Sequence, residues 1–260
     1  MKFIYIGVAT SLLLIIAAGC SPEETQDETS NELTIAAASD LHRAFSEVGL
    51  AFEEETGTPV TFSFGSTGQL ADQIENGAPF DVFAAANIEF IDRLDDQNML
   101  VDGTKELYAI GRIGIVYHED SSFTAEEINQ LDTDDIRRLS IANPEHAPYG
   151  LAAKEALESA GIWEEMDDKL VYGRNISDAL SFVESGNAEA GIVALSLAPK
   201  EDYEFHLIDE SLHNPLEQAI AVIDGTNAET EARNFLEFIK GPTGKPIMES
   251  YGFVVPEENQ

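Results

Sequence analysis

The sequence predicts an α/β fold of two lobes, each built on a mainly parallel sheet that is flanked by helices. Apolar runs of strand length alternate with stretches of helical periodicity over residues 33–94, and the same alternation returns over residues 113–194. Such alternation is typical of parallel strands that are connected by helices on the faces of a sheet. Two sets of these units, with no Gly/Pro-rich linker between them, favour two lobes joined by strands that cross from one lobe to the other.

The first set begins directly after a polar segment. Residues 33–38 (LTIAAA) form an apolar run of strand length. Apolar residues then recur at spacings of three and four from Ser39 to Gly57, which predicts a helix that ends at this glycine. Residues 59–64 (PVTFSF) and 81–85 (DVFAA) are predicted as two further strands, and a helix is expected after each of them.

The second half of the chain repeats this pattern of strands and helices. Strands are expected at residues 113–117, 139–142, 170–172 and 190–194, and helices at residues 150–161, 177–185 and 230–240. The last of these helices is placed to return to the first lobe and cover it.

These elements predict how the chain divides between the lobes. Residues 33–109 together with 226–260 are assigned to lobe 1, and residues 110–225 to lobe 2. The expected hinges are the connecting segments at residues 108–113 and 221–225, each of which contains a glycine.

The N-terminus has the layout of an export signal. Residues 1–19 contain Lys2, an apolar run too short to cross a bilayer, and small residues before Cys20, the single cysteine of the chain. Small residues before a cysteine resemble a bacterial lipoprotein processing site, which implies cleavage after Gly19 and lipidation of Cys20. Residues 20–32 are then the lipidated cysteine and a disordered acidic tether. The protein is expected to be exported and anchored on the outer face of the cytoplasmic membrane or in the periplasm.

The charge balance excludes one large class of partners. The chain has 49 acidic and 14 basic residues, a formal net charge of −35. Nucleic acid is a poor partner for such a chain because binding to phosphate backbones requires basic patches. The acids are scattered among apolar patterns, so they are expected on solvated faces. This surface suits a saline medium, in which ions screen the repulsion between like charges.

Four predicted junctions between a strand and a helix carry groups that can bind an anion. Ser39 follows the first strand, Ser66 and Thr67 follow the second, and residues 149–150 and 174–177 begin two helices of the second set. A helix N-terminus has unpaired N–H groups and a partial positive charge, so it binds an anion without a basic side chain. The alternative is that the hydroxyl groups only cap their own helices. Arg43 and Arg174 are the only basic residues near these junctions.

The motifs of the common enzyme classes are absent from the sequence. Ser39 and His42 are not surrounded by a G-x-S-x-G motif, and no glycine-rich nucleotide motif or P-loop occurs. The histidines lack the spacing of metal ligands. The chain is therefore expected to be a binding protein, not an enzyme, and to need no cofactor.

Five segments carry a resemblance to a known family. They read LTIAAASD, FSFGSTGQLADQIENGAPFDVFAAA, ANPEHAPYGLAAKEAL, GIVALSLA and FIKGPTGKPIMESYGF, and they span residues 33–253 in family order. The chain resembles the molybdate-binding periplasmic proteins of ABC importers. This resemblance implies a periplasmic-binding-protein fold of type II, in which two α/β lobes close like a hinge on a ligand in the cleft between them.

The resemblance also implies which residues contact the metal-containing oxyanion. Ser39 would donate its hydroxyl and backbone N–H, and Thr67 would supply a second hydroxyl, with Ser66 as the adjacent candidate. The backbone N–H groups of Tyr149 and Ile176 would come from the other lobe.

Further expectations follow from the same resemblance. The ligand would be molybdate or tungstate, the partner would be the permease of an ABC importer, and the protein would act as a monomer. Ala194 departs from the pattern, because some members of the family have at this position a tyrosine whose hydroxyl reaches the ligand.

Two other functions stay open at this point. The same fold could bind another solute, such as sulfate, phosphate or ferric ion. The chain could also be an interaction module displayed on the surface by its lipid anchor. Dispersed tyrosines do not favour the iron site, and an interaction module has no need of four helix starts with N–H and hydroxyl groups.

Overall fold

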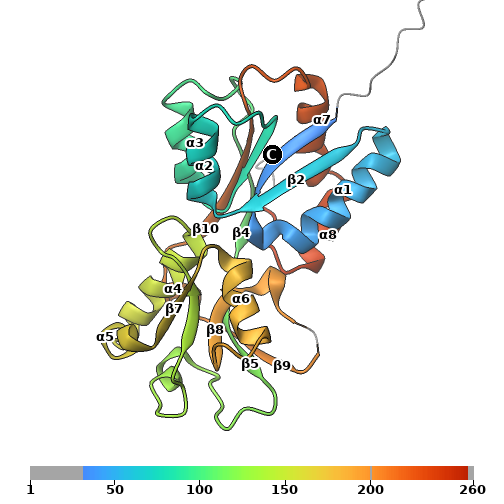
Figure 1. The fold of residues 1–260 in the computed structure, drawn as a ribbon. Helices are drawn as coiled ribbons and strands as arrows, with labels where there is room; N and C mark the ends of the chain where they lie inside the picture. Colours follow the sequence, from blue (N-terminus) through green and yellow to red (C-terminus); the bar gives the residue numbers. More distant parts are fainter. Residues whose placement is uncertain (1–31, 200, 257–260) are drawn as a thin grey trace, which may run out of the picture.

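The computed structural model describes residues 32–199 and 201–256. It shows two lobes, each built around a five-stranded mixed sheet with helices on its faces (Figure 1). The two-lobed α/β fold expected from the sequence is confirmed. The export signal and the lipidation of Cys20 lie outside the described residues.

The first lobe contains the sheet of order β2-β1-β3-β10-β4. Strands β2 and β3 both run parallel to β1, whereas β10 pairs antiparallel with β3 and β4. Its strands and helices are β1 (Leu33–Ala38), η1 (Ser39–Leu41), α1 (His42–Thr56), β2 (Val60–Gly65), α2 (Thr67–Glu75), β3 (Val82–Ala85), α3 (Ile88–Asp95), β4 (Glu106–Gly111), β10 (Leu216–Val222), α7 (Glu229–Lys240) and α8 (Gly244–Ser250).

The second lobe contains the sheet of order β7-β6-β8-β5-β9. Strands β7 and β8 run parallel to β6, and β5 is antiparallel to β8 and β9. Its elements are β5 (Ile113–His118), η2 (Ile128–Leu131), β6 (Leu139–Ala142), α4 (Pro148–Ser159), α5 (Trp163–Met166), η3 (Asp167–Lys169), β7 (Leu170–Gly173), α6 (Ile176–Glu184), β8 (Ala190–Ala194), η4 (Leu195–Leu197), β9 (Tyr203–Leu207) and η5 (Glu210–Leu212).

Helices cover both faces of the first sheet, so its interior strand β1 is apolar except for Thr34. In β1, Leu33, Ile35 and Ala37 pack into the core that includes α1 and α7, whereas Ala36 faces α2 and α3 on the other side. This two-sided burial explains why residues 35–38 form a continuous apolar run and not an alternating one. Helix α1 ends where the sequence predicts, because Gly57 adopts the left-handed conformation that closes a helix (φ 75°).

Strand β10 changes the expected division of the chain between the lobes. The expected boundary put residues 110–225 in lobe 2, but β10 pairs with β3 and β4 in the first sheet. The chain therefore crosses between lobes at Arg112 and again at residues 208–215. The first crossing lies within the expected hinge at 108–113, whereas the expected hinge at 221–225 is wrong. Antiparallel pairing of residues distant in the chain leaves no signal in a local apolar pattern.

None of the described helices has both the length and the apolar character needed to cross a membrane.

Gly111 provides a test of how tightly the lobes fit together. A Cβ atom at this position would lie 2.0 Å from the Tyr149 hydroxyl of the other lobe. We expect Gly111→Ala to lower the free energy of unfolding by about 1 to 3 kcal/mol, the usual cost of overpacking a buried site. The variant should also have a larger radius of gyration by solution scattering, because the lobes must move apart. Adding Tyr149→Phe removes the hydroxyl oxygen that the new Cβ atom would meet. The double variant should therefore recover part of the stability and have a radius of gyration closer to that of the natural protein. Unchanged stability and radius in Gly111→Ala would contradict this account of the interface.

Candidate functional site

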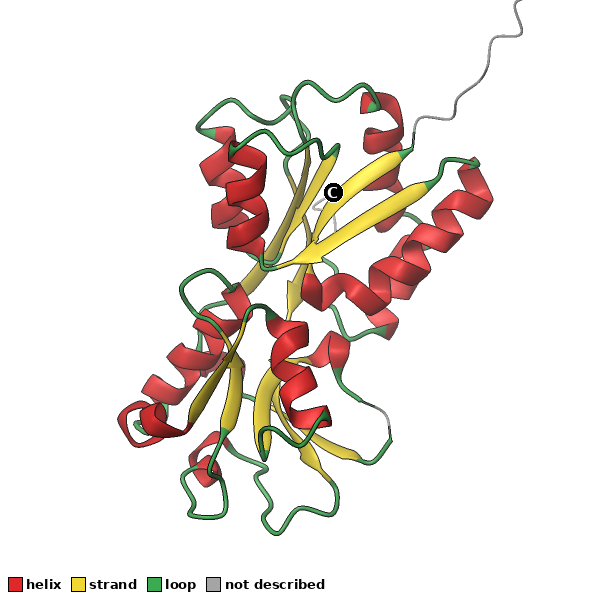
Figure 2. Cartoon of the chain, viewed as in Figure 1, coloured by secondary structure: helices red, strands yellow, loops and turns green. Residues whose placement is uncertain are grey.

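The starts of four helical segments meet where the two lobes face each other. In the first lobe, η1 leads into α1 directly after β1, and α2 begins after β2. In the second lobe, α4 follows β6 and α6 follows β7. Figure 2 shows these helices around the junction of the lobes. The arrangement follows from the parallel strands, because ligands in such sheets bind beyond the carboxyl ends of the strands.

A small hollow with a cavity volume of about 10 Å³ lies between these helix starts. All five predicted site residues line it, from both lobes. Its lining residues are Ala38, Ser39, Asp40, Gly65, Ser66, Thr67, Ala86, Ala147, Pro148, Tyr149 and Ile176. Cofactor pockets and drug-sized pockets have volumes of roughly 300 to 1,000 Å³. This hollow is far smaller than such pockets, so it excludes ligands of cofactor or drug size.

The serine hydroxyl groups do not cap their helices. Ser39 is the first residue of η1, whose N-cap is Ala38, and Ser66 is the N-cap of α2 without a side-chain capping bond. By contrast, Asn87 and Asn175 accept capping hydrogen bonds at the starts of α3 and α6. Local capping therefore does not account for Ser39 and Ser66, and this favours a role for them in the hollow.

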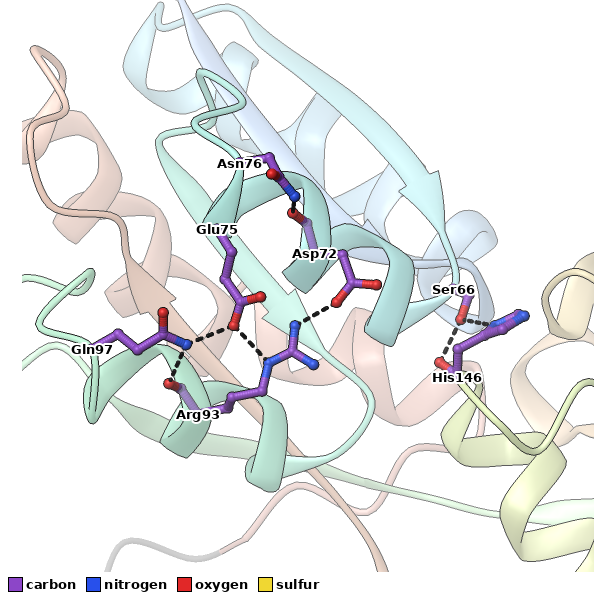
Figure 3. A network of polar contacts seen from close by, with 7 residues as sticks. All are labelled: Ser66, Asp72, Glu75, Asn76, Arg93, Gln97 and His146. Atoms are coloured by element: carbon purple, nitrogen blue, oxygen red, sulfur yellow. Dashed lines mark hydrogen bonds and ion pairs between the residues drawn. The ribbon is translucent and has the colours of Figure 1, made fainter.

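The hydroxyl groups of Ser66 and Thr67 have different partners. Ser66 Oγ donates to the backbone carbonyl of His146 at 2.5 Å and lies 2.8 Å from Nδ1 of the same residue, so it bridges the lobes (Figure 3). The backbone N–H of Ala86 donates to Thr67 Oγ1 at 3.2 Å. Because Thr67 accepts this bond, its own hydroxyl proton is left to donate elsewhere. Thr67 is therefore the better placed of the two to donate to a ligand.

The second lobe contributes backbone N–H groups. Tyr149 and Ile176 lie in the first turns of α4 and α6, where N–H groups have no partner inside the helix. Pro148 occupies the first turn of α4, which suits proline because a missing N–H costs nothing there. The two helix starts thus direct donors and the positive ends of their dipoles at the hollow.

A buried polar network lies beside the hollow and joins the lobes. Gln218 of β10 donates from Nε2 to Asp40 Oδ2 at 2.6 Å and to the Tyr149 hydroxyl at 2.9 Å. Its Oε1 accepts from the Tyr108 hydroxyl at 2.9 Å. Asp40 Oδ1 is buried and has no hydrogen-bond partner among the described residues. The sequence analysis named Tyr149 for its backbone N–H. The structure shows in addition that its side-chain hydroxyl joins the lobes by accepting a hydrogen bond from Gln218.

Burial changes the acidity of the groups in this network. Desolvation raises the pKa of the Asp40 carboxyl from 3.8 to about 6, although hydrogen bonds with Gln218 and Tyr149 lower it in part. Burial and the nearby Asp40 carboxylate raise the pKa of Tyr108 and Tyr149 well above 10, so both keep their protons. Asp40 is therefore the group of the network that can change charge near neutral pH.

Further hydrogen bonds hold the lobes together around the hollow. Ser177 Oγ donates to the carbonyl of Ser39 at 3.1 Å, and Ser196 Oγ donates to the carbonyl of Asp40 at 2.7 Å. The backbone N–H of Gly68 donates to the carbonyl of His146 at 2.9 Å. These bonds connect η1 and the first turn of α2 to the second lobe. The structure therefore represents a closed arrangement of the lobes.

The two basic residues near the junctions do not line the hollow. Arg43 donates to the backbone carbonyl of Ala198 at 2.8 Å. Arg174 is largely exposed and pairs with Asp178 at 2.6 Å. The lining residues include no lysine, arginine or histidine. An anion in the hollow would therefore depend on backbone N–H groups, hydroxyls and helix dipoles.

Sequence reasoning missed the residues that support the donors. Gln218, Tyr108 and Ala86 gave no signal, because their importance comes from contacts with residues far away in the chain. Asp40 was visible next to Ser39, but its complete burial was not. Ala194, the departure from the family pattern, is buried at the end of β8 and is not among the residues that line the hollow.

No group of three or more His, Cys, Asp and Glu side chains that could hold a metal ion occurs within residues 32–199 and 201–256.

The fold and the cleft define a class of protein that binds a solute between two lobes. The sequence pattern of bacterial extracellular solute-binding proteins matches residues 33–254, and the chain belongs to this family.

Relatives and a solved structure narrow the comparison. The molybdate-binding protein ModA of Rhodobacter capsulatus is 33% identical over 226 residues, which cover 86% of this chain and 89% of the relative. YvgL of Bacillus subtilis, named as a substrate-binding lipoprotein of an ABC transporter, is 29% identical over 96% of each chain. The periplasmic molybdate-binding protein of Azotobacter vinelandii has a TM-score of 0.82 at 27% identity and covers 87% of this chain and 100% of its own. These relatives are solute-binding proteins, and the resemblance stated from the sequence is confirmed.

Proposed function

We propose that the protein captures molybdate or tungstate outside the cytoplasm and delivers it to the permease of an ABC importer. The observation that carries this proposal is the hollow itself. Donors from four helix starts converge on it, it is small, and no basic side chain lines it. The relatives named as molybdate-binding proteins support the choice of ligand.

The proposed contacts follow from the donors that are free. Thr67 Oγ1 accepts from Ala86 and can donate its proton to the oxyanion. Ser39 Oγ has no hydrogen bond to another described residue, so its hydroxyl is free to donate as well. Tyr149 and Ile176 would add backbone N–H groups from the second lobe. Neutral donors bind a dianion without burying a counter-ion, and a rigid ring of donors discriminates between oxyanions by size.

The division of these donors between lobes would couple binding to closure. Ser39 and Thr67 belong to the first lobe, whereas Tyr149 and Ile176 belong to the second. One small ion can reach all four only when the lobes are together, so the ligand favours the closed form. Closure is a signal that a permease can recognise.

A singly protonated oxyanion such as hydrogen phosphate is the second candidate ligand. It is favoured by one observation: Asp40 lines the hollow, and its Oδ1 has no hydrogen-bond partner in the part of the chain that the structure describes. An ionised carboxylate there could accept the proton of hydrogen phosphate, which molybdate lacks. Asp40→Asn would then abolish phosphate binding, whereas binding of molybdate would persist.

We also propose that the protein is a monomer held at the membrane by lipid on Cys20. The support for the anchor is the sequence before this cysteine together with YvgL, a relative that is named a lipoprotein and that aligns over 96% of the chain. A lipid with more than one acyl chain binds a membrane stably.

Calorimetry with a panel of anions tests the choice of ligand. We expect molybdate and tungstate to bind with one-to-one stoichiometry, and at least about 100-fold more tightly than sulfate or phosphate, since about 3 kcal/mol separates a fitted from a misfitted oxyanion. Ferric ion serves as a further comparison. Sulfate or phosphate binding as tight as molybdate binding would transfer the proposal to that ligand. The absence of binding to every ion would favour a surface interaction module.

Substitutions in the loop before α2 test the assignment of donors. Thr67→Ala should weaken molybdate binding by about 1 to 3 kcal/mol, the cost of losing a hydrogen bond to a charged group. Thr67→Ser keeps the hydroxyl and is the matched control, which should bind nearly as tightly as the natural protein. Ser66→Ala should cost less, because its hydroxyl is bonded to His146. The reverse order of effects at 66 and 67 would show that the donor has been misassigned.

Cell fractionation tests the lipid anchor. Replacing Cys20 with Ser removes the thiol that would be lipidated, so the protein should leave the membrane fraction. Its affinity for molybdate, measured by calorimetry, should stay within about a factor of two because the site lies in the folded lobes. Retention of Cys20→Ser in the membrane fraction would instead indicate an uncleaved N-terminal anchor.

A further inference from the structure

Asp40 occupies an unusual position for a carboxyl group. It is fully buried, lines the hollow proposed to hold a dianion, and lies where the two lobes meet. No basic side chain lines the hollow to offset its charge. A buried carboxylate beside a dianion, without a counter-ion, is strongly disfavoured in a medium of low polarity.

The hydrogen bonds around Asp40 compensate only in part for the cost of ionisation. Gln218 provides one proton to Oδ2 and its second proton to Tyr149, while Tyr108 fixes the orientation of the amide. The Tyr149 hydroxyl also favours the ionised carboxyl by hydrogen bonding. Oδ1 has no hydrogen-bond partner within residues 32–199 and 201–256. A buried carboxylate is stable when several donors surround it, and this one is left with an unpaired oxygen.

We infer that Asp40 takes up a proton when the lobes close on a dianionic oxyanion, so that ligand capture and proton uptake form one equilibrium. This inference rests on the proposed function. In the neutral form Asp40 adds no charge beside the ligand, and the unpaired oxygen no longer carries a full share of negative charge. Asp40 is thus a positioning residue that sets how affinity depends on pH.

Opening of the cleft would reverse the uptake of the proton. Tyr149 belongs to the second lobe, and the bond of Ser196 to the Asp40 carbonyl also crosses between lobes. When the lobes separate, water reaches the carboxyl and favours its ionised form. The pKa of Asp40 is therefore higher in the closed form than in the open form, where it returns toward 3.8 from the closed value of about 6.

Among the described residues, no other charged group around Asp40 accounts for such behaviour. The titratable groups that bear on it are the hydroxyls of Tyr108 from β4 and Tyr149 from α4, and both stay protonated. From α6 and η4 the neighbours are the hydroxyls of Ser177 and Ser196, which bond the backbone at residues 39 and 40. On α1, the guanidinium of Arg43 is directed to the carbonyl of Ala198, and the loop before α4 adds His146, which contacts Ser66.

The sign of the pH dependence follows from these two forms. A proton that binds the closed form more tightly favours closure, so affinity is greatest at low pH. The affinity should fall by up to about tenfold per pH unit as the pH rises from the pKa of Asp40 in the open form to its pKa in the closed form. Above the closed-form pKa the affinity should level off. A bound dianion raises the closed-form pKa further, which extends the decline into the neutral range.

Calorimetry with molybdate from about pH 5.5 to about pH 8.5 tests the inference, with Asp40→Asn as the matched neutral variant. The natural protein should bind progressively more weakly as the pH rises, and Asp40→Asn should lose this slope and bind more tightly at the upper end. Ligand protonation affects both proteins equally, so their difference isolates Asp40. His146→Gln should keep the slope whatever its absolute affinity, since histidine is the other residue type that ordinarily titrates in this range.

Proton uptake by the natural protein provides a measurement that needs no variant. Titrations near pH 7 in buffers of different ionisation enthalpy should show that a fraction of a proton, up to one, is taken up per molybdate bound, and Asp40→Asn should take up none. A pH-independent affinity, no net uptake, or a slope retained in Asp40→Asn would overturn the inference and leave the proposed function intact. Failure of every oxyanion to bind at any pH would overturn both.

Discussion

The side chain of Gln218 holds the two lobes in the geometry on which the rest of the site depends. Its amide bonds Asp40 and Tyr108 in one lobe and Tyr149 in the other. Buried polar groups require partners, so closure must bring the Tyr149 hydroxyl to this amide. The same contact leaves no room for a side chain at Gly111 and fixes the start of α4, which aims the Tyr149 N–H at the hollow. Tyr149 thus contributes its side chain to the contact between the lobes and its backbone N–H to the proposed site.

The second feature of the site is the absence of basic side chains from a hollow that is proposed to hold an anion. The chain carries a formal charge of −35, and its few arginines near the cleft are engaged elsewhere. Helix starts solve this problem because their donors and dipoles are part of the backbone and bring no counter-ion that must be desolvated. Long-range repulsion of the ligand by the acidic surface is weak in saline solution, whereas the short-range hydrogen bonds are unaffected.

These two features are connected through Asp40. Asp40 is next to Ser39 in the chain. Because Ser39 lies at the hollow, any residue at position 40 lies in the contact between the lobes. A carboxyl there makes closure sensitive to pH, and Asn in its place would not. The hydrogen bonds across the cleft from Ser177 and Ser196 to the backbone at residues 39 and 40 tie this segment to the second lobe. The ligand, the proton and the two lobes therefore act on one short segment of chain.

The sequence alone determined the fold class and the helix starts, and its resemblance to a known family singled out five of the residues that line the hollow. This was possible because the apolar period of strands and helices is local, and because the parallel topology brings the carboxyl ends of strands to one edge. Only the tertiary structure decided that β10 returns to the first sheet, that Thr67 and not Ser66 keeps a free proton, and that Asp40 is fully buried. Each of these depends on partners far away in the chain, such as Ala86, His146 and Gln218. Local sequence patterns carry no record of such contacts, since they form only when the sheets are assembled and the lobes meet.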